Sequence, residues 1–309
     1  MLFRSVPIYP GSRDLSHESL GRRALWAADP YVAYRTMVET GGARAHGWEH
    51  FDHEHWTTDL LFDYWTVSGD AWAQAELAQL GQSLKALMRL TRYSTAWIQA
   101  VRAEGWTMQS FAQIYQATGD ANLRAYALRR VHEIIDVQRG KNHPSKALAF
   151  QTNYPGTQWP MDHEFYMPWQ HGALLYGYLG AYRMFQDPLL LQICEDSVSA
   201  VDYAWLCNYQ DPRLGLVPDG LRYYVITKYQ GQPVPQNYFD RTVPLRWGDA
   251  PLGGAHTFLI GGLFQLADWS SNPTVRAHAA YYAQHLQPVL TENLRWNKWN
   301  FIEPPRFAQ

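Results

Sequence analysis

Hydrophobic and polar positions follow one plan that the chain repeats four times. A loop rich in aromatic and polar residues leads into an apolar helix, a short break follows, and a more amphipathic helix completes the unit. Each break ends in a residue type that caps helix N-termini, namely Asp70, Asp120, Asp187 and Asn272. Pro188 and Pro273 follow two of these caps at the first helical position, where a missing N–H costs little. The pattern therefore predicts four αα-hairpins.

The same pattern gives approximate helix boundaries. The first helices are expected at about 53–68, 106–119, 169–185 and 253–269, and the second at about 71–90, 121–139, from 188 onward and 274–294. Because the first helices are apolar on more than one side and the second on only one, we expect an inner and an outer layer. The predicted fold class is all-α, an incomplete (α/α) toroid with a small β excursion near residues 215–245. Residues 1–46 are interpreted as a lead-in or truncated hairpin, and residues 47–309 as the toroid domain.

The loops before the four first helices hold most of the clusters of His with Asp or Glu and of Trp with Gly. These loops span residues 48–59, 102–109, 162–171 and 246–256. If the inner helices are parallel, all four loops emerge at the same end of the fold. We therefore expect His55, Trp106, His163 and His256 to surround one concavity, with the short Gly-Asp turns at the opposite end.

Composition narrows the range of partners. The formal net charge of −2 gives no electrostatic reason to expect nucleic acid or an anionic membrane, and no run of about 18 apolar residues could span a bilayer. The chain has 14 Trp and 20 Tyr, whose flat faces suit stacking on sugar rings as well as core filling. This composition is compatible with an oligo- or polysaccharide as partner and equally with a large aromatic core. Cys194 and Cys207 lie too far apart along one predicted helical region for a disulfide and are expected to be free thiols.

The N-terminus leaves the localisation open. Residues Met1 to Tyr9 lack the charged, apolar and small-residue segments of a signal peptide. Residues Leu2 to Ser5 match the translation of a common sequencing-adapter end, so the natural reading frame is expected to extend upstream. A secreted or periplasmic protein could have lost its signal in this way.

Two local motifs carry a resemblance to a known class of proteins. Asp52-His53-x-His55 precedes a helix that ends in Ser-Gly-Asp, and Arg102-x-x-Gly105-Trp106 precedes one that ends in Ala-Thr-Gly-Asp. This combination resembles the (α/α) toroid carbohydrate-active enzymes, in particular the central domain of rhamnogalacturonan exolyase-like polysaccharide lyases, and is best over residues 47–139. The resemblance implies a glycan cleft at the loop-rich end. Glycoside hydrolases, lyases and sugar epimerases share this scaffold, so the reaction stays open.

A polysaccharide lyase must neutralise a carboxylate, remove the neighbouring proton and protonate the leaving oxygen. The candidates for proton transfer are His53, His55, His163 and Tyr166, and the candidate for the carboxylate is Arg102. The candidates for substrate contact are Trp48, Trp56, Trp106, Glu164, Trp169, His171, Trp247, Asp249 and His256. No cofactor is expected, and no metal, because the histidines around position 53 do not give the i, i+4 spacing of a helical zinc site.

Each of these assignments has an alternative. The Asp-His-Glu triplets could be helix caps with surface histidines, Arg102 could cap a helix, and Trp106 alone is more typical of a core residue. A hydrolase would instead pair Asp249 with Glu164 or Asp59, because glycosidic hydrolysis uses two carboxyl groups. A non-catalytic glycan-binding or scaffold fragment is a further possibility.

Overall fold

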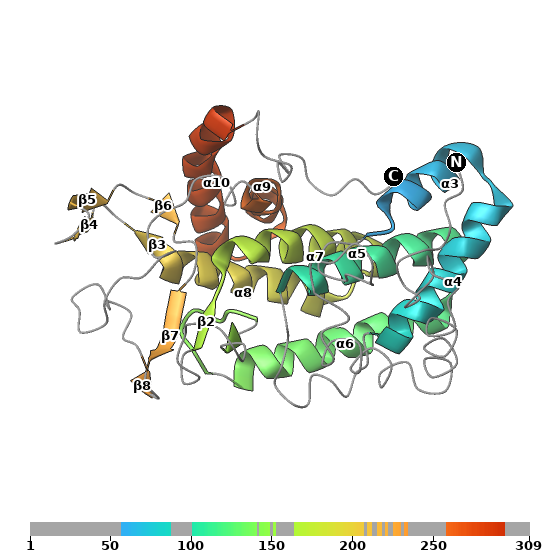
Figure 1. The fold of residues 1–309 in the computed structure, drawn as a ribbon, viewed down its shortest axis with the longest axis horizontal. Helices are drawn as coiled ribbons and strands as arrows, with labels where there is room; N and C mark the ends of the chain where they lie inside the picture. The colour runs from blue at the N-terminus through green and yellow to red at the C-terminus, as the bar shows by residue number, and fades with distance from the viewer. Residues whose placement is uncertain are drawn as a thin grey trace, which may run out of the picture.

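The computed structural model describes residues 57–87, 101–140, 142–148, 151–152, 164–206, 209–211, 215–217, 220–221, 225–229, 232–233 and 258–293. This part of the chain is mostly helical, which confirms the all-α prediction. Figure 1 shows its helices arranged as successive hairpins. The hairpins are α3 (Asp59–Ser68) with α4 (Ala71–Leu87), α5 (Val101–Thr118) with α6 (Ala121–Gly140), α7 (His171–Phe185) with α8 (Pro188–Ala204), and α9 (Leu259–Trp269) with α10 (Pro273–Asn293).

The four predicted caps are present and act through their side chains. In each turn the side-chain oxygen accepts a hydrogen bond from a backbone N–H two residues later, at 2.7 to 3.0 Å. The pairs are Asp70 with Trp72, Asp120 with Asn122, Asp187 with Leu189 and Asn272 with Thr274. These bonds satisfy donors that the first turn of a helix leaves open, so the second helix of each hairpin begins where the sequence predicts.

Helices α5 and α7 lie side by side and run in the same direction. Near their starts the backbones are so close that a Cβ on Gly177 would lie 1.8 Å from the carbonyl oxygen of Gly105. Towards their ends the rings of Tyr115 and Phe185 are 5.4 Å apart. Contacts that advance together along both helices require parallel axes. Only glycine permits this approach, because any side chain at position 177 would meet backbone.

Helix α9 continues the arrangement on the other side of α7. At the start, a Cβ on Gly172 would lie 2.6 Å from Phe258, directly before α9. At the end, the rings of Tyr182 and Trp269 are 5.9 Å apart. Helices α5, α7 and α9 therefore begin at one end, which we call the loop end. Figure 1 shows α5 and α7 running along the longest axis, whereas α9 is seen nearly end-on and α10 stands across α7 and α8.

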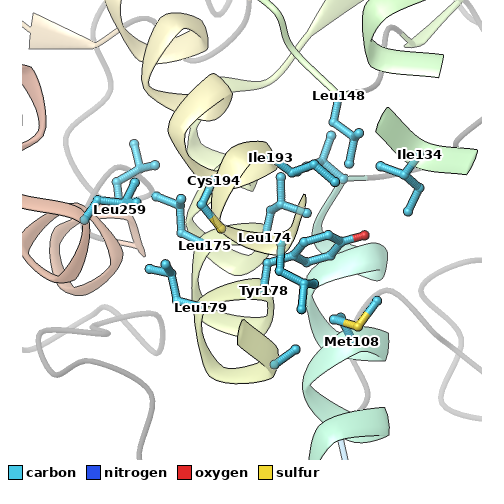
Figure 2. Packing of buried hydrophobic residues seen from close by; sticks show 14 of the residues in the cluster. Met108, Ile134, Leu148, Leu174, Leu175, Tyr178, Leu179, Ile193, Cys194 and Leu259 are labelled. Atoms are coloured by element: carbon cyan, nitrogen blue, oxygen red, sulfur yellow. The ribbon is translucent and has the colours of Figure 1, made fainter. Parts of the chain in front are cut away.

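The core is formed mainly by α5 and α7, which are buried along most of their length. Figure 2 shows Met108 of α5, Leu174 and Tyr178 of α7 and Ile193 of α8 packed together. Cys194 is buried nearby with a free thiol, as predicted. Cys207 lies outside the described residues.

Helix α5 begins earlier than predicted. It starts at Val101, whereas the sequence predicts a start at Trp106. The glycine that looked like a break, Gly105, instead lies within the helix, where its lack of a side chain lets α7 approach. Arg102 and Trp106 therefore belong to the first turns of α5 rather than to a loop. The predicted starts at residues 53 and 253 lie outside the described residues.

The β excursion is larger than predicted. A four-stranded antiparallel sheet has the order β1 (Gln151–Thr152), β2 (Glu164–Tyr166), β7 (Val225–Tyr229) and β8 (Gln232–Pro233). Two further pairs are β3 (Trp205–Leu206) with β6 (Gly220–Leu221) and β4 (Tyr209–Asp211) with β5 (Gly215–Val217). Strand β7 therefore lies within the predicted β excursion, but its partner β2 comes from the segment directly before α7 and contains the candidate site residues Glu164 and Tyr166.

Candidate functional site

Side chains from three separate segments meet at the loop end. The ring of Phe258 lies 6.1 Å from that of Trp106 and 6.0 Å from that of Trp169, centroid to centroid. Trp169 belongs to the short 3₁₀ helix η2 (Pro168–Gln170) that leads into α7. The segments that begin α5, precede α7 and precede α9 thus come together, which parallel inner helices require.

The two tryptophans form a packed cluster rather than an open stacking surface. Trp106 is 4% exposed and Trp169 is 6% exposed, and Ala173 fills the space between them and Phe258. This differs from the predicted role in sugar stacking, for which a ring face must be open to solvent. The physical reason is the early start of α5, which places Trp106 inside the helix against α7.

Arg102 is a charged residue that lies at the edge of this aromatic cluster. Its guanidinium carbon lies 5.6 Å from the centroid of the Trp169 ring, a cation–π arrangement, and the side chain is partly exposed. The predicted pairing of Arg102 with a loop tryptophan is therefore present, but with Trp169 rather than Trp106. Guanidinium groups pair well with carboxylates, because their donors match the two carboxylate oxygens.

Tyr166 occupies a core position. Its side chain is fully buried, and its hydroxyl donates a 2.8 Å hydrogen bond to the carbonyl oxygen of Ala200 in α8. The hydroxyl is thus directed into the outer layer and away from solvent. This position does not suit the proton transfer that the sequence predicts for Tyr166, because a substrate could not reach the oxygen.

His171 is also buried, and its ring is held by backbone groups. Its Nδ1 lies 3.3 Å from the carbonyl oxygen of Met167, and the N–H of Leu148 donates to its Nε2 at 3.4 Å. Burial lowers the pKa of His171 to about 4, although the backbone hydrogen bonds raise it in part. The imidazole is therefore neutral at pH 7, with Nδ1–H as donor and Nε2 as acceptor. It joins the segment after α6 to the start of α7 and has no surface for substrate contact.

Glu164 lies on β2 and is partly exposed. The hydroxyl of Thr227 in β7 is 3.3 Å from its carboxylate and 3.2 Å from its carbonyl oxygen. The negative charge of the Glu164 carboxylate raises the pKa of the nearby His143 imidazole.

His143 was not predicted as a site residue. It follows the end of α6 and is partly exposed, and its Nδ1 lies 2.7 Å from the hydroxyl oxygen and 3.2 Å from the backbone nitrogen of Ser145. Burial lowers the pKa of His143 below its usual 6.5, and the charge of Glu164 opposes this shift in part. The ring is therefore neutral at pH 7. Only the predicted topology could have indicated His143 as a site residue. The second helix of a hairpin returns to the end where the first begins, so residues after α6 lie near the start of α5.

Asp59, the alternative carboxylate, has a structural position. Its carboxylate accepts hydrogen bonds from the side-chain amides of Gln109 and Gln113 in α5 and from the hydroxyl of Thr57. These bonds fasten the start of α3 to the middle of α5. The remaining candidates lie outside the described residues, namely Trp48, His53, His55, Trp56, His163, Trp247, Asp249 and His256.

The described residues bring together no group of three His, Cys, Asp or Glu side chains that could hold a metal ion. Among the described helices, none has both the length and the apolar character needed to cross a membrane. Comparisons of the chain with protein-family models, with curated proteins and with solved structures find no match.

Proposed function

We propose that the chain is a carbohydrate-active enzyme of the (α/α) toroid class, and that it is a polysaccharide lyase acting on an acidic glycan. The parallel course of α5 and α7, with α9 beginning beside the start of α7, supports this class, because a toroid is built by adding hairpins side by side in one sense. The described hairpins are fewer than a closed ring of six would need, so the proposed toroid is incomplete.

One observation carries the proposal. A partly exposed guanidinium, that of Arg102, and a partly exposed neutral imidazole, that of His143, lie at the same end of the α5–α6 hairpin. The first is near the start of α5 and the second follows the end of α6. A fixed cation and a base near neutral pH are the two groups that abstraction of a proton beside a carboxylate requires.

The chemistry follows from these two groups. Arg102 binds the carboxylate of a uronate and stabilises the negative charge that develops on it. His143 takes the proton from the carbon beside the carboxyl group at its Nε2, in the tautomer whose Nδ1–H donates to the hydroxyl oxygen of Ser145. The bond from the next carbon to the glycosidic oxygen breaks, and a carbon–carbon double bond forms between the two carbons. The leaving oxygen takes up a proton, for which His53, His55 and His163 remain the candidates. Tyr166 and His171 have no part in this scheme.

The experiment is an incubation of the full chain with uronate polysaccharides such as polygalacturonate and alginate. The unsaturated product is detected by its ultraviolet absorbance. Arg102→Gln and His143→Gln are each expected to lower kcat/KM by a factor of about 10² or more. The matched controls Arg129→Gln and His132→Gln change exposed residues of α6 and are expected to retain activity.

Other outcomes would overturn the proposal. New reducing ends without ultraviolet absorbance would indicate a hydrolase, in which Asp or Glu residues carry the reaction. Full activity in His143→Gln would remove the proposed base. Binding without any product would leave a glycan-binding protein in place of an enzyme.

A further inference from the structure

A second cluster of aromatic and polar side chains lies between α8 and α10. His278, Tyr281, Tyr282 and His285 are three to four residues apart in α10, so they share one face of the helix. Asp202 near the end of α8 and Trp205 directly after it lie against this face. We call these six residues the outer aromatic patch. Its members come from the α8 region and α10, whereas the proposed site combines Arg102 of α5 with His143 after α6.

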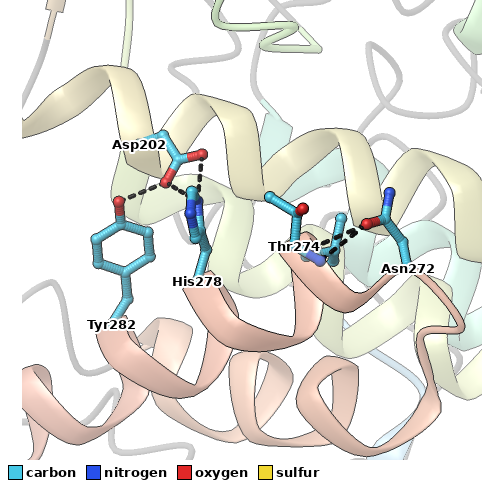
Figure 3. Close-up of polar contacts among 6 residues, drawn as sticks. Asp202, Asn272, Thr274, His278 and Tyr282 are labelled. Atoms are coloured by element: carbon cyan, nitrogen blue, oxygen red, sulfur yellow. Dashed lines mark hydrogen bonds and ion pairs between the residues drawn. The ribbon is translucent and has the colours of Figure 1, made fainter.

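The polar half of the patch is organised by Asp202. Figure 3 shows Tyr282 and His278 both directed at its carboxylate. The Tyr282 hydroxyl donates to one oxygen, and Nδ1 of His278 lies 2.9 and 3.0 Å from the two oxygens. The side chain of Asp202 is 34% exposed and that of His278 is 46% exposed. The carboxylate is thus fixed in place and retains lone pairs that face solvent.

The aromatic half of the patch is centred on Tyr281. Its ring is 40% exposed and lies 3.9 Å from that of His285 at an interplanar angle of 33°, close to a stacked arrangement. Behind it, Trp205 packs 4.8 Å from the ring of Tyr282. Among the described residues, the buried indole Nε1–H of Trp205 has no hydrogen-bond acceptor.

We propose that the outer aromatic patch binds a neutral sugar residue of a glycan chain. Sugars combine an apolar ring face, which packs on an exposed aromatic ring such as that of Tyr281, with hydroxyl groups that donate to a carboxylate such as that of Asp202. The negative charge of Asp202 stands at the centre of the patch and disfavours a uronate there. The inference goes beyond the proposed lyase activity and does not depend on it, because a glycan-binding surface needs no catalysis.

The experiment is affinity electrophoresis of the full chain in gels that contain one polysaccharide each. The neutral probes are galactan, xylan and mixed-linkage β-glucan, and the acidic probe is polygalacturonate. We expect retardation in at least one neutral gel. Tyr281→Ala is expected to weaken that binding roughly tenfold.

Tyr64→Ala is the matched control. Tyr64 in α3 is 42% exposed, close to the value for Tyr281, but its hydroxyl is bound to Asp70 and it lies in another hairpin. This variant is expected to be retarded like the wild type. Because both substitutions remove exposed rings, the melting temperatures should stay near that of the wild type and so exclude a folding defect.

Three outcomes would each overturn the proposal. Absence of retardation in all three neutral gels would remove the ligand class. Unchanged retardation of Tyr281→Ala would place binding elsewhere. Retardation by polygalacturonate alone, lost in Tyr281→Ala, would show that the charge argument for a neutral sugar is wrong. Loss of lyase activity with gel retardation intact would count against the proposed function only.

Discussion

Acidification should destabilise the protein through His171. The pKa of this buried imidazole is about 4 in the folded chain, against an ordinary value of 6.5. Between these values the unfolded state binds more protons than the folded state, so the free energy of unfolding falls as the pH falls. The contribution of neutral His171 to the free energy of unfolding is complete above pH 6.5 and is lost progressively as the pH falls towards 4.

The magnitude follows from the two pKa values. Their full difference corresponds to about 3 kcal/mol of unfolding free energy, lost below pH 4. By pH 5 the unfolded imidazole is almost fully protonated while the folded one is still mostly neutral, so about 2 kcal/mol is already lost. This is a large part of the stability of an ordinary domain, which is about 5–15 kcal/mol.

The assay compares urea unfolding of the wild type and of His171→Gln at pH 7.5 and at pH 5, followed by tryptophan fluorescence. Glutamine can both donate to Met167 and accept from Leu148, but it does not titrate. The stability lead of the wild type over the variant should therefore shrink by about 2 kcal/mol at pH 5. Contributions from His143 and other groups are common to both proteins and cancel.

The same difference should not arise at an exposed histidine. His132→Gln in α6 changes an exposed histidine and is the control for the substitution itself. If the difference in unfolding free energy between the wild type and His171→Gln were equal at both pH values, the imidazole of His171 would have an ordinary pKa. The buried, neutral position assigned to His171 would then be refuted.

Three further predictions concern packing and the proposed base. Gly177→Ala would force apart the backbones of α5 and α7 and should lower the unfolding free energy, measured with urea or heat, by about 3 kcal/mol or more. The control Gly119→Ala, in an open turn at φ 67°, should lower it by only about 1 kcal/mol. Tyr166→Phe should lower the unfolding free energy by about 1 kcal/mol, because it removes a buried hydrogen bond, and should leave turnover unchanged. The acidic limb of the kcat/KM profile should lie below pH 6.5, because burial lowers the pKa of His143, and Glu164→Gln should move it to still lower pH by removing the charge that raises this pKa.

The hairpins could be predicted from the sequence because their signals are local. A cap such as Asp70 or Asn272 bonds to a backbone N–H two residues away, so its effect is decided within one turn. The same holds for Pro188 at the first position of α8. Four such signals, each between an apolar and an amphipathic stretch, define the order of the helices without any knowledge of the packing.

The roles of the candidate side chains could not be predicted, because they depend on which helix packs beside which. Gly105 has the local signature of a break, but the close approach of α7 makes it a helical residue. The helix then extends back to Val101 and buries Trp106. Tyr166 is likewise near the loop end in sequence, yet the pairing of its strand with β7 directs its hydroxyl into α8.

The residues that the sequence analysis missed share one topological position. The predicted site residues lie before the inner helices, because helices that begin at one end bring those segments together. The segment after α6 and the end of α8 reach the same end, since the N–H of Leu148 bonds to His171 at the start of α7 and the ring of His143 contacts that of Tyr203. His143 follows α6, and Asp202 and Trp205 lie at the end of α8. A search of repeated αα-hairpins should therefore read the residues after each second helix together with those before each first helix, because both groups line the same end.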